Sequence, residues 1–300
     1  MTDELRREAP APGNSAQVTI GNTTMNTRND EFASGAGEHA SVFGQFLDAD
    51  ALRGRAPAVY ADAAHERTSP TYTFLSTQKV LEALSRAGFL PVEASQTVTR
   101  VRSPLHARHL VRLRRRYETV EIADSIPELV LTNSHDGSAA YHLRMGIHRV
   151  VCRNGMVVSD GTFPVWRVAH RGNILDELIA AALQMAERFE VLAAQVARME
   201  RTRLEPAQRL AFAERAATIR YPDGLPLGLD PARLLVPRRP EDVGEDAWRT
   251  LNMVSEHVLR GGIRLVDDRG RRRSTRGISS IRQNVRVNTA LWEAAASLAA

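Results

Sequence analysis

The stretch from residue 129 to 158 constrains the fold more than any other part of this chain. It contains the pairs Asp136-Gly137 and Asn154-Gly155, with apolar and polar residues alternating on either side of them. Asn-Gly and Asp-Gly favour the positive φ angles that two-residue hairpin turns require. We therefore expect two hairpins, and hence at least three antiparallel strands, in this region.

The sequence leaves the register of the first hairpin open. A strict two-residue loop places Leu131 opposite His142, on a face that also holds Arg144. A loop one residue longer reverses that pairing, because successive strand residues point to opposite faces. The cleaner apolar face of the second strand consists of Tyr141, Leu143, Met145 and Ile147. We therefore predict the hairpin but not its register.

Shorter patterns add further strands and a helix. Residues 93–102 and 110–117 alternate between polar and apolar side chains, which predicts two more strands. Residues 163–168 also have the pattern of a strand, and Pro164 places it at a sheet edge because proline cannot donate a backbone hydrogen bond. Residues 77–88 have apolar positions at helical spacing and end in glycine, which predicts a short helix with a glycine C-cap.

A change of period after residue 173 predicts one long amphipathic helix. Asn173 is a suitable N-cap, and no proline follows until Pro206. Apolar residues then recur at steps of three and four, which is the spacing of a heptad seam. They are Leu175, Leu178, Ala182, Met185, Phe189, Leu192, Val196 and Met199. This seam can pack on the sheet of its own chain, or it can form a homo-oligomer contact through residues 175–199.

The chain divides into three parts. Residues 1–45 are rich in small and polar residues and cannot bury enough apolar surface to order themselves, so we expect disorder there. Residues 46–221 contain the expected sheet, the long helix and a second helix over 206–220. Residues 222–300 begin with a segment rich in proline and glycine and form a C-terminal helical lobe packed on the core. The predicted fold is therefore α+β: an antiparallel sheet with two hairpins packed against a long amphipathic helix, plus this lobe.

The composition indicates a soluble protein in a reducing compartment. At 43% hydrophobic residues, a chain of 300 residues can bury a substantial core, but no apolar run approaches the roughly 20 residues of a transmembrane helix. The single cysteine, Cys152, excludes an internal disulfide and a cysteine-based zinc site. We expect a cytoplasmic protein that uses no cofactor and has no membrane partner.

Arginine clusters are the main indication of a binding function. The formal net charge is +5, and Lys79 is the only lysine, so guanidinium groups supply nearly all the positive charge. The segment Arg100 to Arg116 is dense in arginine and contains no acidic residue. On the strand expected here, Arg112, Arg114 and Arg116 project from one face, at a repeat of about 6.6 to 7 Å that can follow a phosphate backbone. The alternative is a solvated edge strand whose charges prevent aggregation.

A second cluster lies between the helices expected over 241–260 and 278–299. Arg271, Arg272 and Arg273 belong to an arginine-dense loop that also contains several glycines. Such a loop can order on a polyanion, or it can simply be solvated. The two clusters together favour nucleic acid over a small anion, because a small anion needs only a few donors.

Histidines and the cysteine offer a catalytic alternative. The candidates on the predicted hairpins are His135, Asp136, His142, His148 and Cys152. An enzyme would need several of these side chains within hydrogen-bonding distance at one pocket. The chain contains no zinc-binding, hydrolase or P-loop spacing, so we predict no metal site and favour a binding protein over an enzyme. A small buried apolar residue is the simpler interpretation of the cysteine.

Several segments, spread over most of residues 70–295, are characteristic of one protein family. They are Asn133-Ser-His-Asp-Gly, Arg149-Val-Val-Cys-Arg-Asn-Gly, the segment around His170, residues 234–239, residues 248–262 with Asn252 and Glu256, and Val287-Asn-Thr-Ala-Leu-Trp. In these segments the chain resembles the phage- and plasmid-like proteins classed as domain of unknown function 932. The resemblance implies no established activity. It does imply carriage by mobile elements, whose accessory proteins often act on DNA.

The order of elements, strands followed by one long helix, also resembles the core of single-strand annealing proteins, by analogy alone. We predict a nucleic-acid-binding protein of a mobile element, with single-stranded DNA as the main partner and a role in binding or annealing. Arg112, Arg114 and Arg116 would neutralise phosphates with help from Arg271 to Arg273, and Tyr117 or Tyr141 would stack on a base. The alternatives are an enzyme that uses the histidine, aspartate and cysteine set, and an oligomeric structural or partner-binding protein.

Overall fold

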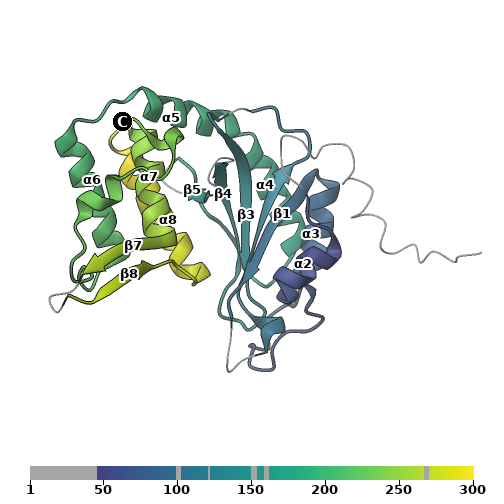
Figure 1. Cartoon of the computed structure of the whole chain (residues 1–300). Coiled ribbons are helices and arrows are strands. Elements are labelled where there is room, and N and C mark those ends of the chain that lie inside the picture. The colour runs from purple at the N-terminus through teal and green to yellow at the C-terminus, as the bar shows by residue number, and fades with distance from the viewer. Residues whose placement is uncertain (1–45, 99–102, 121, 150–153, 159–161, 267–269) are drawn as a thin grey trace, which may run out of the picture.

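The computed structural model describes residues 46–98, 103–120, 122–149, 154–158, 162–266 and 270–300. The disorder predicted for residues 1–45 lies outside the described residues. Within the described part, a six-stranded antiparallel sheet and a two-stranded sheet combine with helices, so the α+β prediction is confirmed (Figure 1).

The larger sheet is an antiparallel meander with one short strand added. Its strands are β1 (Phe89–Gln96), β2 (His109–Arg115), β3 (Ser125–Asn133), β4 (Tyr141–Arg149) and β5 (Asn154–Val158), in that order, and β6 (Trp166–Val168) pairs with β4. The predicted apolar face of β4 is confirmed, because its four apolar side chains lie in the main hydrophobic core. Alternation along the strands therefore sends one face of the sheet into the core.

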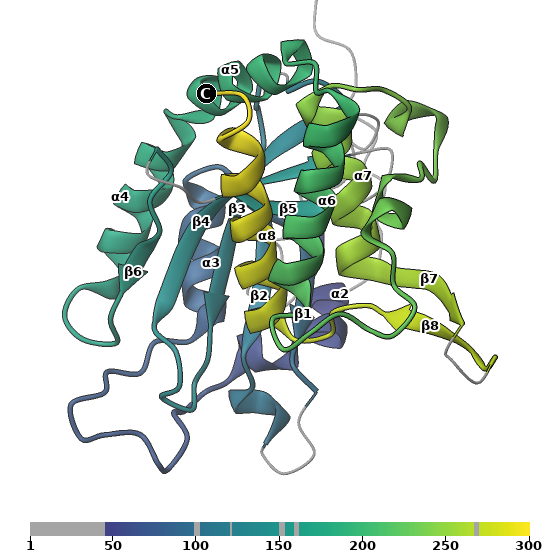
Figure 2. The ribbon, with the colours of Figure 1, turned by 90° about the vertical axis from the view of Figure 1, so that its left-hand side faces the viewer.

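Three helices cover this apolar face. They are α2 (Ala49–Arg55), α3 (Thr77–Arg86) and α4 (Ile174–Ala186) (Figures 1 and 2). The helix predicted over 77–88 is confirmed as α3: Ser76 caps it by accepting a hydrogen bond from Lys79 N, and Gly88 follows it at φ 92°. Its apolar stripe is fully buried, which fixes the helix against the sheet.

The first hairpin has the register that the sequence analysis assigned to a loop one residue longer than two. Leu131 pairs with Leu143 and Thr132 with His142, so the apolar faces of β3 and β4 coincide. Asp136-Gly137 lies within a connection over residues 134–140 rather than in a strict two-residue turn. Gly137 has φ 76°, so the glycine still provides a positive φ in this connection.

The tight turn predicted at Asn154-Gly155 is wrong. Both residues already belong to β5, where Asn154 pairs with Arg149 and Gly155 pairs with His148. The connection between the strands is formed by residues 150–153, which lie outside the described residues. The hairpin itself is present, because β4 and β5 pair antiparallel.

The single long helix predicted after Asn173 is in fact two helices. α4 ends at Ala186 and α5 (Phe189–Arg201) begins after a break, where Arg188 has the non-helical angles φ −96° and ψ 3°. The break lets α4 cover β4 while α5 packs on the C-terminal helices. The heptad residues from Leu178 to Met199 are buried and Leu175 packs against the same core, so the chain itself covers the seam predicted as an oligomer contact.

In the C-terminal lobe two helices pack against each other and against the helix over 206–220, which was predicted as part of the preceding core and which we include in the lobe from here on. These three helices are α6 (Pro206–Arg220), α7 (Ala247–Arg260) and α8 (Ile281–Ala296), with the short 3₁₀ helices η3 (Pro231–Leu235) and η4 (Pro240–Asp242) between the first two. The predicted bounds of α6 are confirmed, and this helix packs with α7 and α8. No helix in the described part of the chain combines the length and apolar character that a bilayer crossing needs.

The arginine-dense loop predicted in this lobe is instead a hairpin. β7 (Gly261–Val266) pairs antiparallel with β8 (Arg272–Arg276), and together they form the two-stranded sheet, here called the ribbon. Ile263 and Leu265 are buried against the lobe, whereas the alternate residues Gly262, Arg264 and Val266 are exposed. This alternation makes a strand of a segment whose arginines and glycines suggested a loop.

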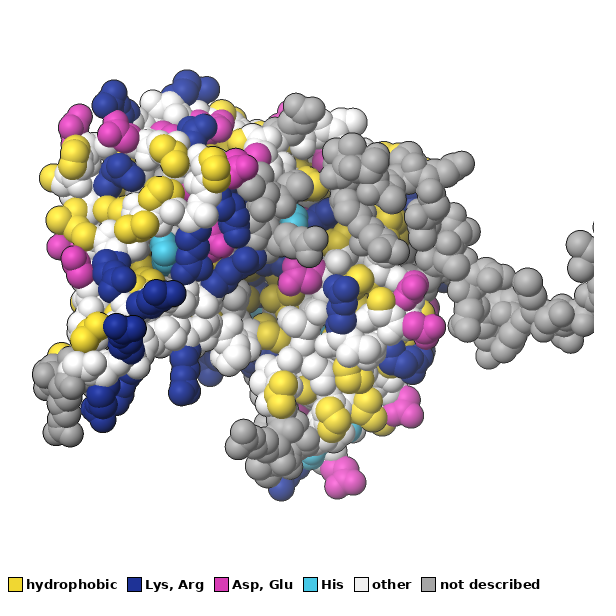
Figure 3. Space-filling model, viewed as in Figure 1, with side chains coloured by type: hydrophobic (Ala, Val, Ile, Leu, Met, Phe, Trp, Pro, Cys, Tyr) yellow, Lys and Arg dark blue, Asp and Glu magenta, His cyan; other side chains and the backbone are white. Residues whose placement is uncertain are grey.

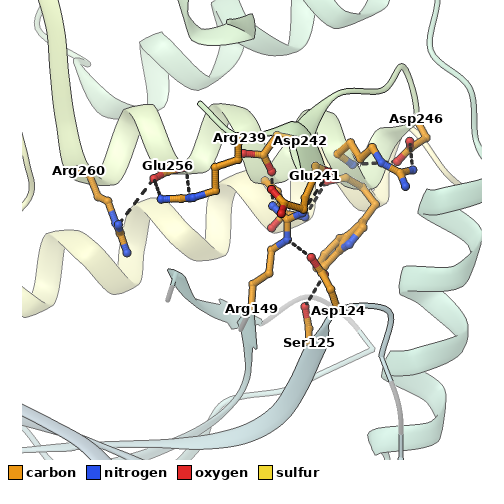
Figure 4. Close-up of polar contacts among 12 residues, drawn as sticks. Asp124, Ser125, Arg149, Arg239, Glu241, Asp242, Asp246, Glu256 and Arg260 are labelled. Atoms are coloured by element: carbon orange, nitrogen blue, oxygen red, sulfur yellow. Dashed lines mark hydrogen bonds and ion pairs between the residues drawn. The ribbon is translucent and has the colours of Figure 1, made fainter. Parts of the chain in front are cut away.

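A buried arginine joins the sheet to the lobe. Arg149, at the end of β4, donates from Nε to Asp124 Oδ2 at 2.5 Å and from Nη1 to Asp242 of η4 (Figure 4). The side chains of Arg149 and Asp242 are almost fully buried. A second pair, Arg239 and Glu256, connects the segment after η3 to α7. We call Arg149, Asp124 and Asp242 the clasp.

Candidate nucleic-acid interface

Arg112 and Arg114 do not form the predicted solvent-facing row. Their exposures are 4% and 5%, and their guanidinium groups lie against the fully buried carboxylate of Glu128 on β3. Arg112 Nη1 lies 3.0 Å from Glu128 Oε2, and Arg114 Nε lies 2.7 Å from Glu128 Oε1. Arg116 follows the end of β2 and is partly buried. The prediction of a water-facing phosphate row on β2 is therefore wrong, because two of its three members neutralise a buried carboxylate.

Arg112 also connects strands that lie apart in the sheet. Its Nη2 donates to Gly155 O at 2.6 Å, and a Cβ built on Gly155 would lie only 2.2 Å from Arg112 Cζ. Gly155 is therefore needed because any side chain there would collide with the Arg112 guanidinium, and not because the backbone turns at this position. No sequence pattern predicts this contact, because only the pairing of the strands brings Gly155 of β5 next to Arg112.

The ribbon exposes the arginine row that β2 lacks. Arg264 pairs with Ser274, and Val266 pairs with Arg272, so these four side chains share the face opposite to Ile263 and Leu265. Arg276 lies on the same face of β8, two residues beyond Ser274, and Arg264, Arg272 and Arg276 are all exposed. Figure 3 shows Lys and Arg side chains gathered at the lower left of the molecule, where the ribbon projects.

The sequence-predicted residues of the second cluster lie on or next to this ribbon. Arg271 directly precedes β8, and Arg272 and Arg273 begin it; all three are exposed. Side chains of the lobe hold the ribbon backbone in place. Arg233 donates to Arg264 O, Arg238 donates to Gly261 O, and Arg220 Nη2 donates to Arg276 O at 3.1 Å. These hydrogen bonds fix the position of the ribbon backbone that carries the exposed arginines.

A cleft of about 710 Å³ is lined by residues of the polar face of the sheet and of α8. Figure 2 shows α8 in front of the strands of this sheet. The arginines of the cleft come from four separate segments and include no member of the row predicted on β2. They are Arg108, Arg144, Arg167, Arg282 and Arg286. Glu293 is the one acidic residue of the lining. The sequence does not reveal this cleft, because the four segments that supply its arginines are far apart along the chain.

Arg144 is the cleft arginine whose pKa is clearly lowered. It is half-buried and donates from Nη1 to Thr132 Oγ1 at 3.1 Å, and it has no carboxylate partner among the described residues. Burial, and after it the charge of Arg108, lower the pKa of Arg144 to about 10. A lowered arginine pKa means that the surroundings of Arg144, without a bound anion, disfavour its positive charge.

The five catalytic candidates lie at different places. His142 lines the cleft, where its Nδ1 donates to Ala140 O at 3.0 Å, and Asp136 lines a neighbouring cavity. His135 is buried in a separate network, and His148 Nδ1 lies 3.9 Å from Glu128 Oε1. Cys152 lies outside the described residues. The described candidates thus show no convergence on one pocket, which the catalytic alternative requires.

A buried polar network surrounds the hydroxyl of Thr77, at the start of α3. Its Oγ1 lies 2.8 Å from His109 Nε2, 3.2 Å from His135 Nε2 and 3.2 Å from the hydroxyl of Tyr141. Burial lowers the pKa of His109 to about 4 and, together with the neighbouring His109, that of His135 to about 3. Both imidazoles are therefore neutral near pH 7. In the sequence these residues are far apart, and they lie on three elements and on the connection between β3 and β4.

This network also excludes one of the two predicted base-stacking residues. Tyr141 is fully buried and donates its hydroxyl proton to Leu75 O at 2.9 Å, so it cannot stack on a bound base. Tyr117 is 71% exposed. Among the described residues, no group of three or more His, Cys, Asp or Glu side chains is arranged to hold a metal ion.

Comparisons with known proteins identify relatives over most of the chain. A family model described as Domain of unknown function (DUF932) matches residues 64–292. UPF0380 protein YfjQ of Escherichia coli (strain K12) is 35% identical over 246 residues, which is 81% of this chain and 88% of that protein. UPF0380 protein YafZ of the same strain is 34% identical over 246 residues, with the same coverage of 81% and 88%. No solved structure matches the chain.

Proposed function

Because this chain belongs to the family described as Domain of unknown function (DUF932), a description that names no activity, we propose its function from its geometry: it binds single-stranded nucleic acid through the outer face of the ribbon. The observation that supports this most directly is the row formed by Arg264, Arg272 and Arg276. The described part of the ribbon, residues 261–266 and 272–276, contains no acidic residue, and the sequence between its strands adds only Asp267 and Asp268. The row is therefore positive and faces water.

The spacing of the row suits a phosphate backbone. Arg272 and Arg276 are four residues apart on β8, which is about 13 to 14 Å along the strand, and Arg264 of β7 pairs with Ser274 midway between them. The three guanidinium groups therefore follow one another along the ribbon and can meet successive phosphates of one strand. Each arginine offers a fork of donors that matches phosphate geometry. Binding rests on neutralised phosphates with little reading of bases, so affinity depends on salt more than on sequence.

A single strand fits this surface better than a duplex. Duplex DNA is stiff over about 150 base pairs, whereas a single strand can bend to place its phosphates along a short row. The mobile-element setting is part of the proposal and rests on the family resemblance. We propose DNA as the main partner and test RNA beside it.

Equilibrium binding tests the proposal. Fluorescence anisotropy would compare a labelled single-stranded DNA, an RNA of the same sequence and the DNA duplex on the wild type and on the triple variant Arg264→Ala, Arg272→Ala, Arg276→Ala. The control variant Arg198→Ala, Arg201→Ala, Arg215→Ala removes three exposed arginines from α5 and α6, with the same change in net charge. We expect single-stranded affinity to fall about tenfold or more in the ribbon variant and about twofold or less in the control. Equal losses in the two variants would show that only net charge matters and would refute the ribbon site.

A further inference from the structure

We infer that the cleft between β4 and α8 is a binding site for a nucleotide, with Arg144 as the partner of its phosphate. This site is separate from the ribbon. It uses other residues, lies on the polar face of the large sheet, and can be present whether or not the ribbon binds a strand.

The charge balance of the sheet supports this assignment. Arg112, Arg114 and Arg149, the fully buried arginines of the large sheet, each pair with a carboxylate. Arg144 pairs with none among the described residues, and Arg108 beside it has the same sign of charge. A half-buried guanidinium without a counter-charge is costly, so an anion in the cleft supplies the missing interaction.

The other cleft arginines extend the positive field around this position. Arg108 reaches Ser138 O at 3.1 Å, and Arg282 and Arg286 enter from α8. The acidic residue of the lining, Glu293, is exposed and lies further along α8 than either of these arginines. The cleft therefore attracts anions, and its charge is suited to phosphate.

The size and apolar walls of the cleft favour a nucleotide over a bare inorganic anion. Its volume of about 710 Å³ lies in the range of small-molecule sites, about 300 to 1,000 Å³. Val165, Ile281, Val285 and Ala290 supply apolar surface to the same lining. A flat base can pack on that surface while a phosphate pairs with Arg144, whereas an inorganic anion would leave most of the cleft unfilled.

His142 adds a polar contact of defined character. Its Nδ1 donates to Ala140 O at 3.0 Å, so the neutral ring keeps Nε2 as a hydrogen-bond acceptor. Burial, and then the charge of Arg144, lower the pKa of His142 below its ordinary value, which keeps the ring neutral near pH 7. A neutral imidazole beside the phosphate site can accept from a sugar hydroxyl or a base amino group.

The nucleotide can come from two sources. It can be a free mononucleotide, or it can be one residue of a strand that also lies on the ribbon. β8 leads through residues 277–280 directly into α8, which supplies Arg282 and Arg286 to the cleft. The two sites therefore adjoin along the chain, and the experiment must separate the sources.

Isothermal titration calorimetry tests the site with the nucleoside 5′-monophosphates, the corresponding nucleosides and inorganic phosphate as probes. We expect a monophosphate to bind more tightly than either of its parts, and Arg144→Gln to weaken that binding about tenfold or more, since a charge-assisted hydrogen bond is lost. Arg115→Gln, an exposed arginine at the end of β2, is the matched control and should bind as the wild type does. In the second arm, affinity for a single-stranded oligonucleotide is measured on the same variants.

The two arms identify the source. Loss in both arms upon Arg144→Gln assigns the cleft to a nucleotide that can be free or part of a strand, and loss in the oligonucleotide arm alone assigns it to a nucleotide within a strand. No Arg144-dependent loss in either arm overturns the inference. The ribbon triple variant should keep monophosphate binding, so failure of the ribbon proposal is distinguishable from failure of this one. Thermal unfolding without ligand checks folding: Arg144→Gln should melt at or above the wild-type temperature, because it removes an uncompensated charge.

Discussion

Glu128 pairs with two arginines of β2 and so keeps them inside the protein rather than facing water. Its carboxylate is fully buried and accepts from both Arg112 and Arg114, which gives each guanidinium a partner inside the protein. From the sequence the two arginines were expected to face water, since Glu128 appears there only as one polar residue in an apolar strand. The difference arises from tertiary pairing, because β2 and β3 align Arg112 with Val130 and so bring Glu128 beside both arginines.

Replacing Glu128 by Gln should destabilise the fold strongly. The change keeps the size of the side chain but removes the buried carboxylate that Arg112 and Arg114 share, at a cost of about 3–5 kcal/mol in the free energy of unfolding. Urea denaturation followed by circular dichroism measures it. Glu214→Gln, on the exposed face of α6, is the control and should change stability by less than about 0.5 kcal/mol. A stability loss in Glu128→Gln as small as in the control would contradict the claim that Glu128 stabilises the fold by pairing with Arg112 and Arg114.

The buried histidines predict a pH dependence of stability. In the folded protein burial lowers the pKa of His109 to about 4 and that of His135 to about 3, from 6.5 in each case. Below about pH 6.5 the unfolded chain binds protons that the folded chain does not, so the free energy of unfolding decreases as the pH falls. The decrease reaches about 1.4 kcal/mol per pH unit for each histidine.

Urea denaturation between about pH 7 and about pH 5 measures this dependence. The variant His135→Gln removes the titrating group but keeps a polar side chain next to Thr77, so its stability should depend less steeply on pH than that of the wild type. Identical slopes in the two proteins would mean that His135 does not titrate below its unfolded value. The comparison of slopes corrects for the carboxylates, which both proteins share.

At the scale of elements, local signals predicted where a helix begins better than where it breaks or where a strand turns. α3 and α6 have the expected bounds because Ser76 caps the first and Pro206 begins the second, and both signals are local. The break between α4 and α5 has no proline or glycine to announce it; it follows from packing on two different partners. The ribbon was missed because its apolar residues are few and its burial depends on the lobe.

The clasp is the polar contact that joins the sheet to the lobe. Asp242→Asn should weaken it, because Arg149 stays buried with one full charge partner fewer. We expect a loss of about 3 kcal/mol in the free energy of unfolding. Faster amide hydrogen exchange in η4 and at the start of α7 should accompany this loss. Glu241→Gln is the matched control, since its side chain is exposed and only its backbone carbonyl accepts from Arg149. Equal exchange rates in the two variants would rule out a joining role for Asp242.

At the scale of the whole molecule, arginines that stabilise the fold lie at different places from arginines that are proposed to bind a ligand. Arginines of the sheet interior pair with carboxylates, whereas those of the ribbon and the cleft face water or a cavity. Counting arginines along the sequence found the ribbon segment through Arg271 to Arg273. It could not find the cleft, whose arginines from β4 and α8 meet only after folding, nor could it show that the densest segment is partly internal.

The ribbon and the cleft lie on one continuous path of the chain. β8 runs into α8 through residues 277–280, and α8 contributes Arg282 and Arg286 to the lining of the cleft. A strand bound on the ribbon can therefore place a nucleotide in the cleft. The ribbon contact is the central claim, since the proposed function depends on it.

The salt dependence of binding tests that claim most directly. The slope of log affinity against log salt for a single-stranded oligonucleotide reports how many phosphates are neutralised, with about 0.7 per phosphate. If Arg264, Arg272 and Arg276 each neutralise one phosphate, the triple alanine variant should have a slope shallower than that of the wild type by about 2. An unchanged slope in this variant would show that the ribbon arginines meet no phosphates and would contradict the proposed function.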